Sequence, residues 1–148
     1  MDVHLTIQII ILLVLLFLSF FFSSAETALT VVSSIKLKTL SDEGNKRAMC
    51  ALKVTEDKNK MLSAILIGNN IVNLSASSLA TSIAIGIWGS YGAGIATGIL
   101  TLLILIFGEV SPKTLATVES VRLSLIYAPI ISFLMTALSP LIYIVNLF

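Results

Sequence analysis

The longest run without a charged side chain, residues 61–108, does most to limit how this chain can fold. A helix crosses the hydrocarbon core of a bilayer with about 20 residues, so this run has room for two spans and a turn. Gly and Ser interrupt the apolar pattern at residues 88–92, where Trp and Tyr also favour a membrane interface. We therefore expect an integral membrane protein with a turn at these residues.

Two further uncharged runs flank this one. Residues 5–22 are apolar enough for a first span, and the residues before them are not basic, so we expect a retained span rather than a cleaved signal peptide. Residues 123–148 are also uncharged but contain Pro129 and Pro140. Their polar side chains recur at helical spacing, which suits a helix lying along the interface about as well as a spanning helix.

The distribution of basic residues predicts the orientation. Seven of the nine Lys and Arg residues lie in the loop at residues 23–60, and the other two follow the third apolar segment. The positive-inside rule places this loop in the cytoplasm and the N-terminus outside. With three spans the C-terminus is also cytoplasmic. Gly44 and Asn45 divide the loop into two expected short helices.

Three polar clusters interrupt the apolar segments, at residues 23–28, 68–73 and 108–113. All three fall at the cytoplasmic ends of the expected spans, and the breaks expected there would expose main-chain carbonyl groups. Antiparallel spans therefore bring hydroxyl, amide and carboxylate oxygens to one depth. Such oxygens are the ligands of Mg²⁺, Ca²⁺ or Na⁺, and broken helices coordinate cations in transporters.

Each cluster also has a simpler explanation when it is taken alone. Ser and Glu at residues 23–26 could cap a following helix, Asn often joins membrane helices, and a Glu at the end of a span is often only interfacial. The prediction of an ion site depends on their shared depth. Because His4 and Cys50 are each alone of their kind, we expect no zinc site and no catalytic pair, and the chain is not predicted to be an enzyme.

The motifs at residues 21–29, 68–73 and 108–114 occur in an order that resembles the transmembrane domain of the CorC/cyclin-M (CNNM) magnesium transporters. The resemblance covers almost the whole chain and implies one domain over residues 1–148. It implies an all-α integral membrane fold, a homodimer in the lipid bilayer of the cell membrane, and a cytoplasmic CBS-pair region outside this sequence. Three transmembrane helices are expected at about residues 5–22, 61–87 and 92–110. Short cytoplasmic helices are expected within about residues 23–60, and a C-terminal juxtamembrane helix at about residues 120–148.

The resemblance further implies Mg²⁺ efflux in exchange for Na⁺, through a site that opens to the cytoplasm. It assigns the side chains of Ser23, Asn70 and Glu109 as ligands. It assigns further main-chain ligands at Ala25, Gly68 and Gly108. The residues that serve the coupling ion or position the site are then Glu26, Ser24, Asn69 and Asn73. A different class of function stays open, namely a membrane scaffold or ion sensor that regulates attached CBS domains. No nucleic-acid partner is expected, since basic residues cluster only in the first loop.

Overall fold

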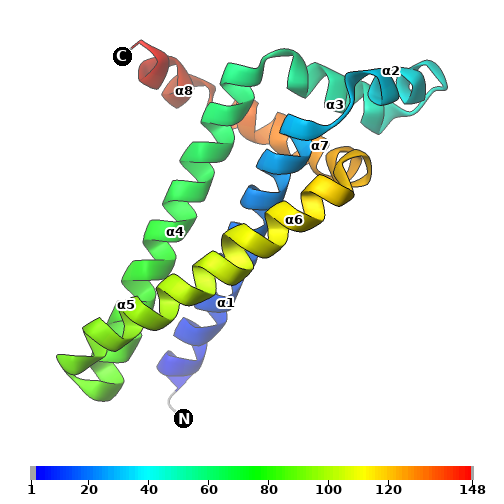
Figure 1. Cartoon of the computed structure of the whole chain (residues 1–148). Coiled ribbons are helices and arrows are strands. Elements are labelled where there is room, and N and C mark those ends of the chain that lie inside the picture. Colours follow the sequence, from blue (N-terminus) through cyan, green and yellow to red (C-terminus); the bar gives the residue numbers. More distant parts are fainter. Residues whose placement is uncertain (1–2, 148) are drawn as a thin grey trace. The chain divides into compact units, whose positions relative to one another are not determined.

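A computed structural model describes residues 3–147, so Met1, Asp2 and Phe148 of the expected 1–148 domain lie outside the described residues. The described part is helical throughout and contains no strand. Its elements in chain order are α1 Val3–Val31, α2 Ser34–Asp42, α3 Lys46–Glu56, α4 Lys58–Trp88, α5 Tyr91–Leu103, the π-helix η1 Ile104–Val110, α6 Ser111–Val118, α7 Ser120–Ala137 and α8 Ser139–Asn146 (Figure 1).

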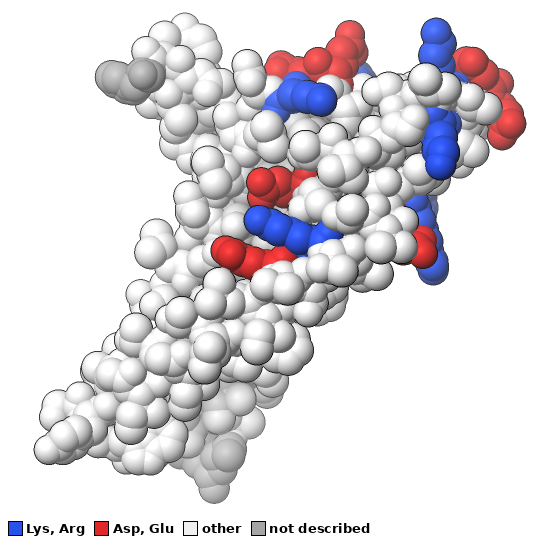
Figure 2. Space-filling model, in the orientation of Figure 1, with Lys and Arg blue, Asp and Glu red and all other residues white. Residues whose placement is uncertain are grey.

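The chain forms two compact units. The described residues of unit 1 are 3–23 and 69–112, and those of unit 2 are 24–68 and 113–147. All nine Lys and Arg residues belong to unit 2, and Glu109 is the one acidic residue among the described residues of unit 1. The surface of unit 1 seen in Figure 2 is accordingly almost entirely white. Unit 1 thus has the composition of a bilayer-spanning body, whereas unit 2 carries the charge.

In unit 1, α4 and α5 form a tight hairpin. Helix α4 ends at Trp88, Gly89 has a φ of +71°, and α5 begins at Tyr91, which confirms the turn predicted at residues 88–92. A Cβ atom added at Gly92 would collide with the backbone of Ala84, so the two helices approach most closely where a side chain is missing. The close approach explains why a glycine stands at this position.

The expected breaks at the first two polar clusters are wrong. Helix α1 continues past Ser23 to Val31, and α4 begins at Lys58 and passes through Gly68. Hydroxyl residues inside a helix can stay in the helical conformation, and one internal glycine costs only about 1 kcal/mol. Residues 23–26 are therefore not a helix cap, and the first and second spans are longer than expected.

The third cluster does alter the helix. Residues 104–110 form η1, in which the N–H of Ser111 donates to the carbonyl oxygen of Ile106, five residues earlier. Helix α6 then begins at Ser111, so Pro112 stands in its first turn, as predicted. The irregularity expected at Gly108 is therefore present, but as a widened turn within a continuous helix.

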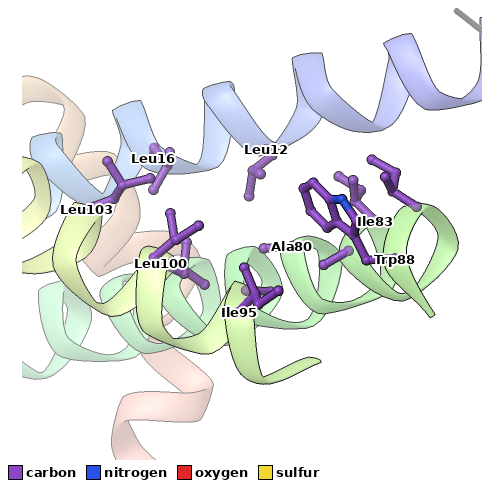
Figure 3. Close-up of a pocket in the computed structure, with 12 residues that line it drawn as sticks. Leu12, Leu16, Ala80, Ile83, Trp88, Ile95, Leu100 and Leu103 are labelled. Carbon is purple, nitrogen blue, oxygen red and sulfur yellow. The ribbon is translucent and has the colours of Figure 1, made fainter. Parts of the chain in front are cut away.

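The other end of unit 1 is apolar. A pocket of about 200 Å³ lies between α1, α4 and α5 and is lined by aliphatic side chains, together with Trp88 (Figure 3). Leu12 of α1, Ile83 of α4 and Leu100 of α5 are among its lining residues. Such a surface offers no polar partner to an ion, so any ion chemistry in unit 1 belongs to the polar residues of the same three helices.

Unit 2 is built around α2, α3 and α7, whose buried residues Leu37, Ala51 and Ala128 form one cluster. The side chain of Ser33 caps α2, and that of Asn45 caps α3 by accepting from the N–H of Ala48 at 3.1 Å. The two short helices predicted in the loop are confirmed. They occupy only residues 34–56 rather than starting at residue 23, because α1 extends into the loop.

Within residues 3–147, four helices are long and apolar enough to cross a membrane, one more than expected. They are Val3–Val31, Lys58–Trp88, Tyr91–Val118 and Ser120–Ala137. The count differs because α7 is uncharged after Arg122 and reaches the minimum length for a span. The expected single helix at residues 120–148 is also two helices, since α7 ends at Ala137 and Pro140 stands in the first turn of α8. The all-α membrane class itself is confirmed.

Candidate functional site

The polar centre of unit 1 is a contact between three helices. The hydroxyl of Ser19 on α1 donates a hydrogen bond of 2.8 Å to Oδ1 of Asn73 on α4. Gly108 of η1 lies against the same hydroxyl, because a Cβ atom added there would be 2.8 Å from Ser19 Oγ. Ser19 is 1% exposed and Gly108 is buried. These three residues join α1, α4 and η1 at one depth.

The next polar level lies one helical turn away. The helices α1 and α4 run in opposite directions (Figure 1). The residue one turn after Ser19 on α1 and the residue one turn before Asn73 on α4 therefore lie on the same side of the contact between Ser19 and Asn73. Ser23, four residues after Ser19, is 2% exposed. Asn69, four residues before Asn73, has a buried Oδ1 atom without a hydrogen-bond partner. A buried acceptor without a donor costs about 1–3 kcal/mol, so Asn69 marks a place where a donor or cation would be stabilised.

Glu109 follows Gly108 within η1 and is partly buried. A π-helical segment adds one residue to the helix locally and leaves main-chain groups in altered positions, and such segments occur frequently at functional sites. Glu109 forms no ion pair within the part of the chain that the structure describes. Among the described residues of unit 1 it is the single carboxylate, next in sequence to Gly108, which lies against the Ser19 hydroxyl.

The structure places the remaining predicted residues of unit 1 as follows. Asn70 is exposed in the single chain, although its neighbour Asn69 holds a buried oxygen. Four residues were predicted to position the site or to serve a coupling ion, and the two of them in unit 1, Asn69 and Asn73, face the buried cluster. Ser23, Asn70, Gly108 and Glu109 all belong to this one unit.

The other four predicted residues belong to unit 2. The hydroxyl of Ser24 donates to the phenolic oxygen of Tyr127 on α7 at 3.1 Å, and Ala25 is fully buried. Glu26 is partly buried, and its main-chain oxygen accepts from the hydroxyl of Thr30 at 2.6 Å. Gly68 lies inside α4. In this unit the serine motif therefore serves to hold the end of α1 against α7.

The sequence reasoning missed Ser19 and Tyr127. Ser19 is the one hydroxyl residue between Ile7 and Phe22, and its spacing of four from Ser23 places both on one face of α1. That spacing was a usable signal. Tyr127 gave none, because a tyrosine in an apolar helix more often only marks an interface.

The donor set is one of hard oxygen atoms. Among the described residues, no group of three His, Cys, Asp or Glu residues is placed to hold a metal ion. Hydroxyl, amide and main-chain oxygens with one carboxylate suit Mg²⁺, Ca²⁺ or Na⁺ rather than soft transition metals. The fold and this cluster together define a multi-helix membrane domain with an oxygen-lined polar centre.

Comparison with known proteins gives the family. The model of the cyclin M transmembrane N-terminal domain matches residues 10–148, so the chain belongs to that family. It is 40% identical over 147 residues to a UPF0053 protein of Haemophilus influenzae, covering 99% of this chain and 35% of the relative. It is 33% identical to the UPF0053 inner membrane protein YfjD of Escherichia coli, covering 87% of this chain and 30% of the relative.

A chloroplastic DUF21 domain-containing protein of Arabidopsis thaliana is 35% identical, over 90% of this chain and 20% of that relative. The chain thus spans about a third or less of the length of these relatives. The family resemblance is confirmed over nearly the whole chain. The match does not include the remaining residues of the relatives.

Proposed function

We propose that this chain is the membrane domain of a transporter that exports Mg²⁺ from the cytoplasm in exchange for Na⁺. The observation that carries the proposal is the position of Glu109. Among the described residues of unit 1, it is the one residue of the types Asp, Glu, Lys and Arg. It follows directly on Gly108, which lies against the buried contact of Ser19 with Asn73. Ionisable groups at membrane depth are costly and mark ion pathways.

The proposed ligands in unit 1 are the side chains of Ser23, Asn70 and Glu109 and the main chain at Gly108. Mg²⁺ takes six oxygen atoms at about 2.0–2.1 Å and gives up its water slowly. Asn69 and Asn73 would position the site or bind the coupling ion. The partnerless oxygen of Asn69 supports this role, because a cation is one of the few groups that could satisfy it.

The charge of this donor set suits transport. A single carboxylate supplies one negative charge to a divalent ion, and the other donors are neutral. Binding tightens with the number of charged ligands. A site with one carboxylate therefore binds Mg²⁺ weakly enough to release it and lets Na⁺ compete for the same oxygen atoms. This reasoning predicts that the two ions exclude one another.

The test is Mg²⁺ flux in proteoliposomes, with and without an opposing Na⁺ gradient. Glu109→Gln keeps the shape and removes the charge, and Asn70→Ala removes one donor. Glu56→Gln on α3, in unit 2, is the matched control because it removes a carboxylate from an exposed residue. We expect flux that follows the Na⁺ gradient in the wild type and control and is lost in both site variants. Normal flux in both site variants would refute the proposal.

Binding of Mg²⁺ without flux has a separate meaning. If the full-length protein also fails to transport while it binds Mg²⁺, the alternative of a scaffold or ion sensor that regulates attached CBS domains is favoured. If only the full-length protein transports, the parts outside this chain are required for transport.

We further propose three spans, with α7 along the cytoplasmic surface as a juxtamembrane helix. Its packing supports this arrangement, because α7 lies against α3, a short helix with four charged residues. Charged helices of this kind stay outside the hydrocarbon core. In a Cys50→Ala background, a membrane-impermeant thiol reagent added outside should label Ser90→Cys but neither Lys46→Cys nor Tyr143→Cys. External labelling at residue 143 would instead show that α7 spans the membrane.

The expected homodimer in the cell membrane also belongs to the proposal. Gly94 and Gly98 are exposed on α5, with no other atom within 4 Å of an added Cβ in the described chain. Small residues spaced by four allow two membrane helices to approach closely. Disulfide crosslinking of Gly94→Cys in a Cys50→Ala background tests this face, and a protein that stays monomeric in membranes would contradict it.

A further inference from the structure

A second polar site lies within unit 2, away from the residues assigned to ion transport. It is a pocket of about 670 Å³ between the start of α2, the start of α3 and the junction of α6 with α7. Its polar lining comes from separate elements. Apart from Glu119, these residues supply donors or positive charges, and they are Lys36, Asn45, Arg47, Ser120 and Arg122.

The charge of the pocket is positive. Lys36, Arg47 and Arg122 are all exposed, and none forms an ion pair within residues 3–147. Glu119 is the one carboxylate among the lining residues, so the lining carries a net charge of about +2 at neutral pH. Three cations with one carboxylate among them attract a second anion rather than satisfy one another.

The start of α7 adds further donors. Glu119 is the N-cap residue of this 18-residue helix and makes no side-chain cap hydrogen bond. The first N–H groups of a helix lack intrahelical acceptors and carry partial positive charge. Oδ1 of Asn45 is used by the N–H of Ala48, which leaves the Asn45 amide group as a donor. The pocket thus offers donors from a helix end and from side chains together.

The remaining wall is apolar and exposed. Val118 is 76% exposed and Ile126 is 42% exposed, and both line the pocket. After Arg122 the sequence carries no charge to its end. Positive and apolar surfaces therefore meet at the point where the uncharged run begins. Protein surfaces at the headgroup level of a bilayer combine positive and apolar side chains in this way.

We propose that this pocket binds the phosphate of an anionic phospholipid, with the acyl chains along Val118 and Ile126. Basic pockets beside membrane helices recognise anionic lipid headgroups in this way. The apolar wall favours a lipid over a free phosphate compound, because a soluble anion would leave that wall exposed to water. The bound lipid would join α2, α3 and α7 through its headgroup.

The experiment measures binding of phosphatidylglycerol, labelled on an acyl chain, to the purified chain in nonionic detergent at physiological salt. The triple variant Lys36→Gln, Arg47→Gln and Arg122→Gln removes the basic lining. The matched control, Lys38→Gln, Lys46→Gln and Lys58→Gln, removes the same charge from exposed residues of the same region that do not line the pocket. Helicity by circular dichroism checks that each variant folds, and Arg122→Gln alone replaces the triple if the latter does not fold.

Each basic residue near a lipid surface contributes about a fivefold increase in binding, so the triple variant should weaken binding on the order of a hundredfold. The control should weaken it by less than about tenfold, because exposed charges are screened by salt. Three results would overturn the proposal: equal binding of phosphatidylcholine, equal weakening in both triple variants, or displacement of the lipid by a similar concentration of inorganic phosphate. The last would identify a soluble phosphate as the ligand.

Discussion

Replacement of Gly108 by Ala tests the contact between α1, α4 and η1. The added Cβ atom would lie 2.8 Å from Oγ of Ser19, 3.5 Å from Cγ2 of Ile104 and 3.7 Å from Cβ of Ser19. Only the first distance is too short for non-bonded atoms. The clash is relieved if Ser19 changes rotamer, but its hydroxyl then leaves the 2.8 Å hydrogen bond to Asn73. The variant must therefore either strain the contact or lose the bond.

The magnitude follows from three contributions. Overpacking a tight contact costs about 1–3 kcal/mol, and the alternative, leaving Oδ1 of Asn73 without its donor, costs about as much. The change from Gly to Ala within a helix returns up to about 1 kcal/mol. We expect Gly108→Ala to lower the free energy of unfolding by about 1 kcal/mol. In a Ser19→Ala background the clashing oxygen is gone, so the same change should be neutral or stabilising.

The assay is reversible unfolding of the four proteins of this cycle from mixed micelles, followed by circular dichroism. The expected coupling between positions 19 and 108 is about 1–2 kcal/mol. Gly86→Ala on α4 serves as the control, because its added Cβ has no other atom within 4 Å in the described chain. If Gly108→Ala costs the same with and without the Ser19 hydroxyl, the contact described here does not determine the packing of η1.

Three further changes test the fold by the same unfolding measurement. Gly92→Ala should cost about 3 kcal/mol or the whole fold, since the added Cβ meets the backbone of Ala84, which cannot rotate away; a neutral effect would contradict the close hairpin. Asn45→Ala should cost about 1 kcal/mol by removing the cap of α3, and no loss of α3 helicity would refute that role. Tyr127→Phe should lose about 0.6 kcal/mol through its contact with Ser24, and should cost less in a Ser24→Ala background, where that contact is already absent; an equal cost in both backgrounds would contradict the contact.

Local signals in the sequence were sufficient for part of this fold. The hairpin turn was predictable because Gly89 needs a positive φ and aromatic residues flank it. The boundary between α2 and α3 was predictable for the same reason, since Gly44 has a φ of +94° and Asn45 caps the next helix. In each case the residue that determines the structure acts on its own backbone.

The failures have the opposite character. Ser23 and Gly68 were expected to end helices, yet both stay inside one, because neither residue type forbids helical dihedral angles. Whether a buried hydroxyl leaves its helix depends on the helices that pack against it, as the contact of Ser19 with Asn73 shows. At residues 104–110 the sequence predicted an irregularity beside Gly108, but not its π-helical form, which brings Gly108 against Ser19 of α1.

The candidate site divides in the same way. Chemistry alone singled out Glu109 and the asparagines, because few polar residues occur in these apolar segments. Their orientation could not be derived, since adjacent positions on a helix face directions about 100° apart and a small rotation of α4 exchanges them. The family resemblance implied Asn70 as the ligand, whereas in the single chain Asn69 has a buried oxygen and Asn73 accepts from Ser19.

The charge of Glu109 limits how unit 1, taken by itself, can reach a low energy in a bilayer. A lone carboxylate at membrane depth is costly, and the described residues of this unit include no Lys or Arg to balance it. The charge must then be balanced by a proton, by groups outside the unit or by a bound cation. The partnerless oxygen of Asn69 is an acceptor that either a cation or an O–H donor satisfies, so the unfolding of a variant without the charge is needed to separate the two cases. If a bound cation balances the charge, Glu109→Gln should stabilise the domain in the absence of ions and abolish its stabilisation by Mg²⁺, and an unchanged Mg²⁺ effect on unfolding would show that the carboxylate is balanced in another way.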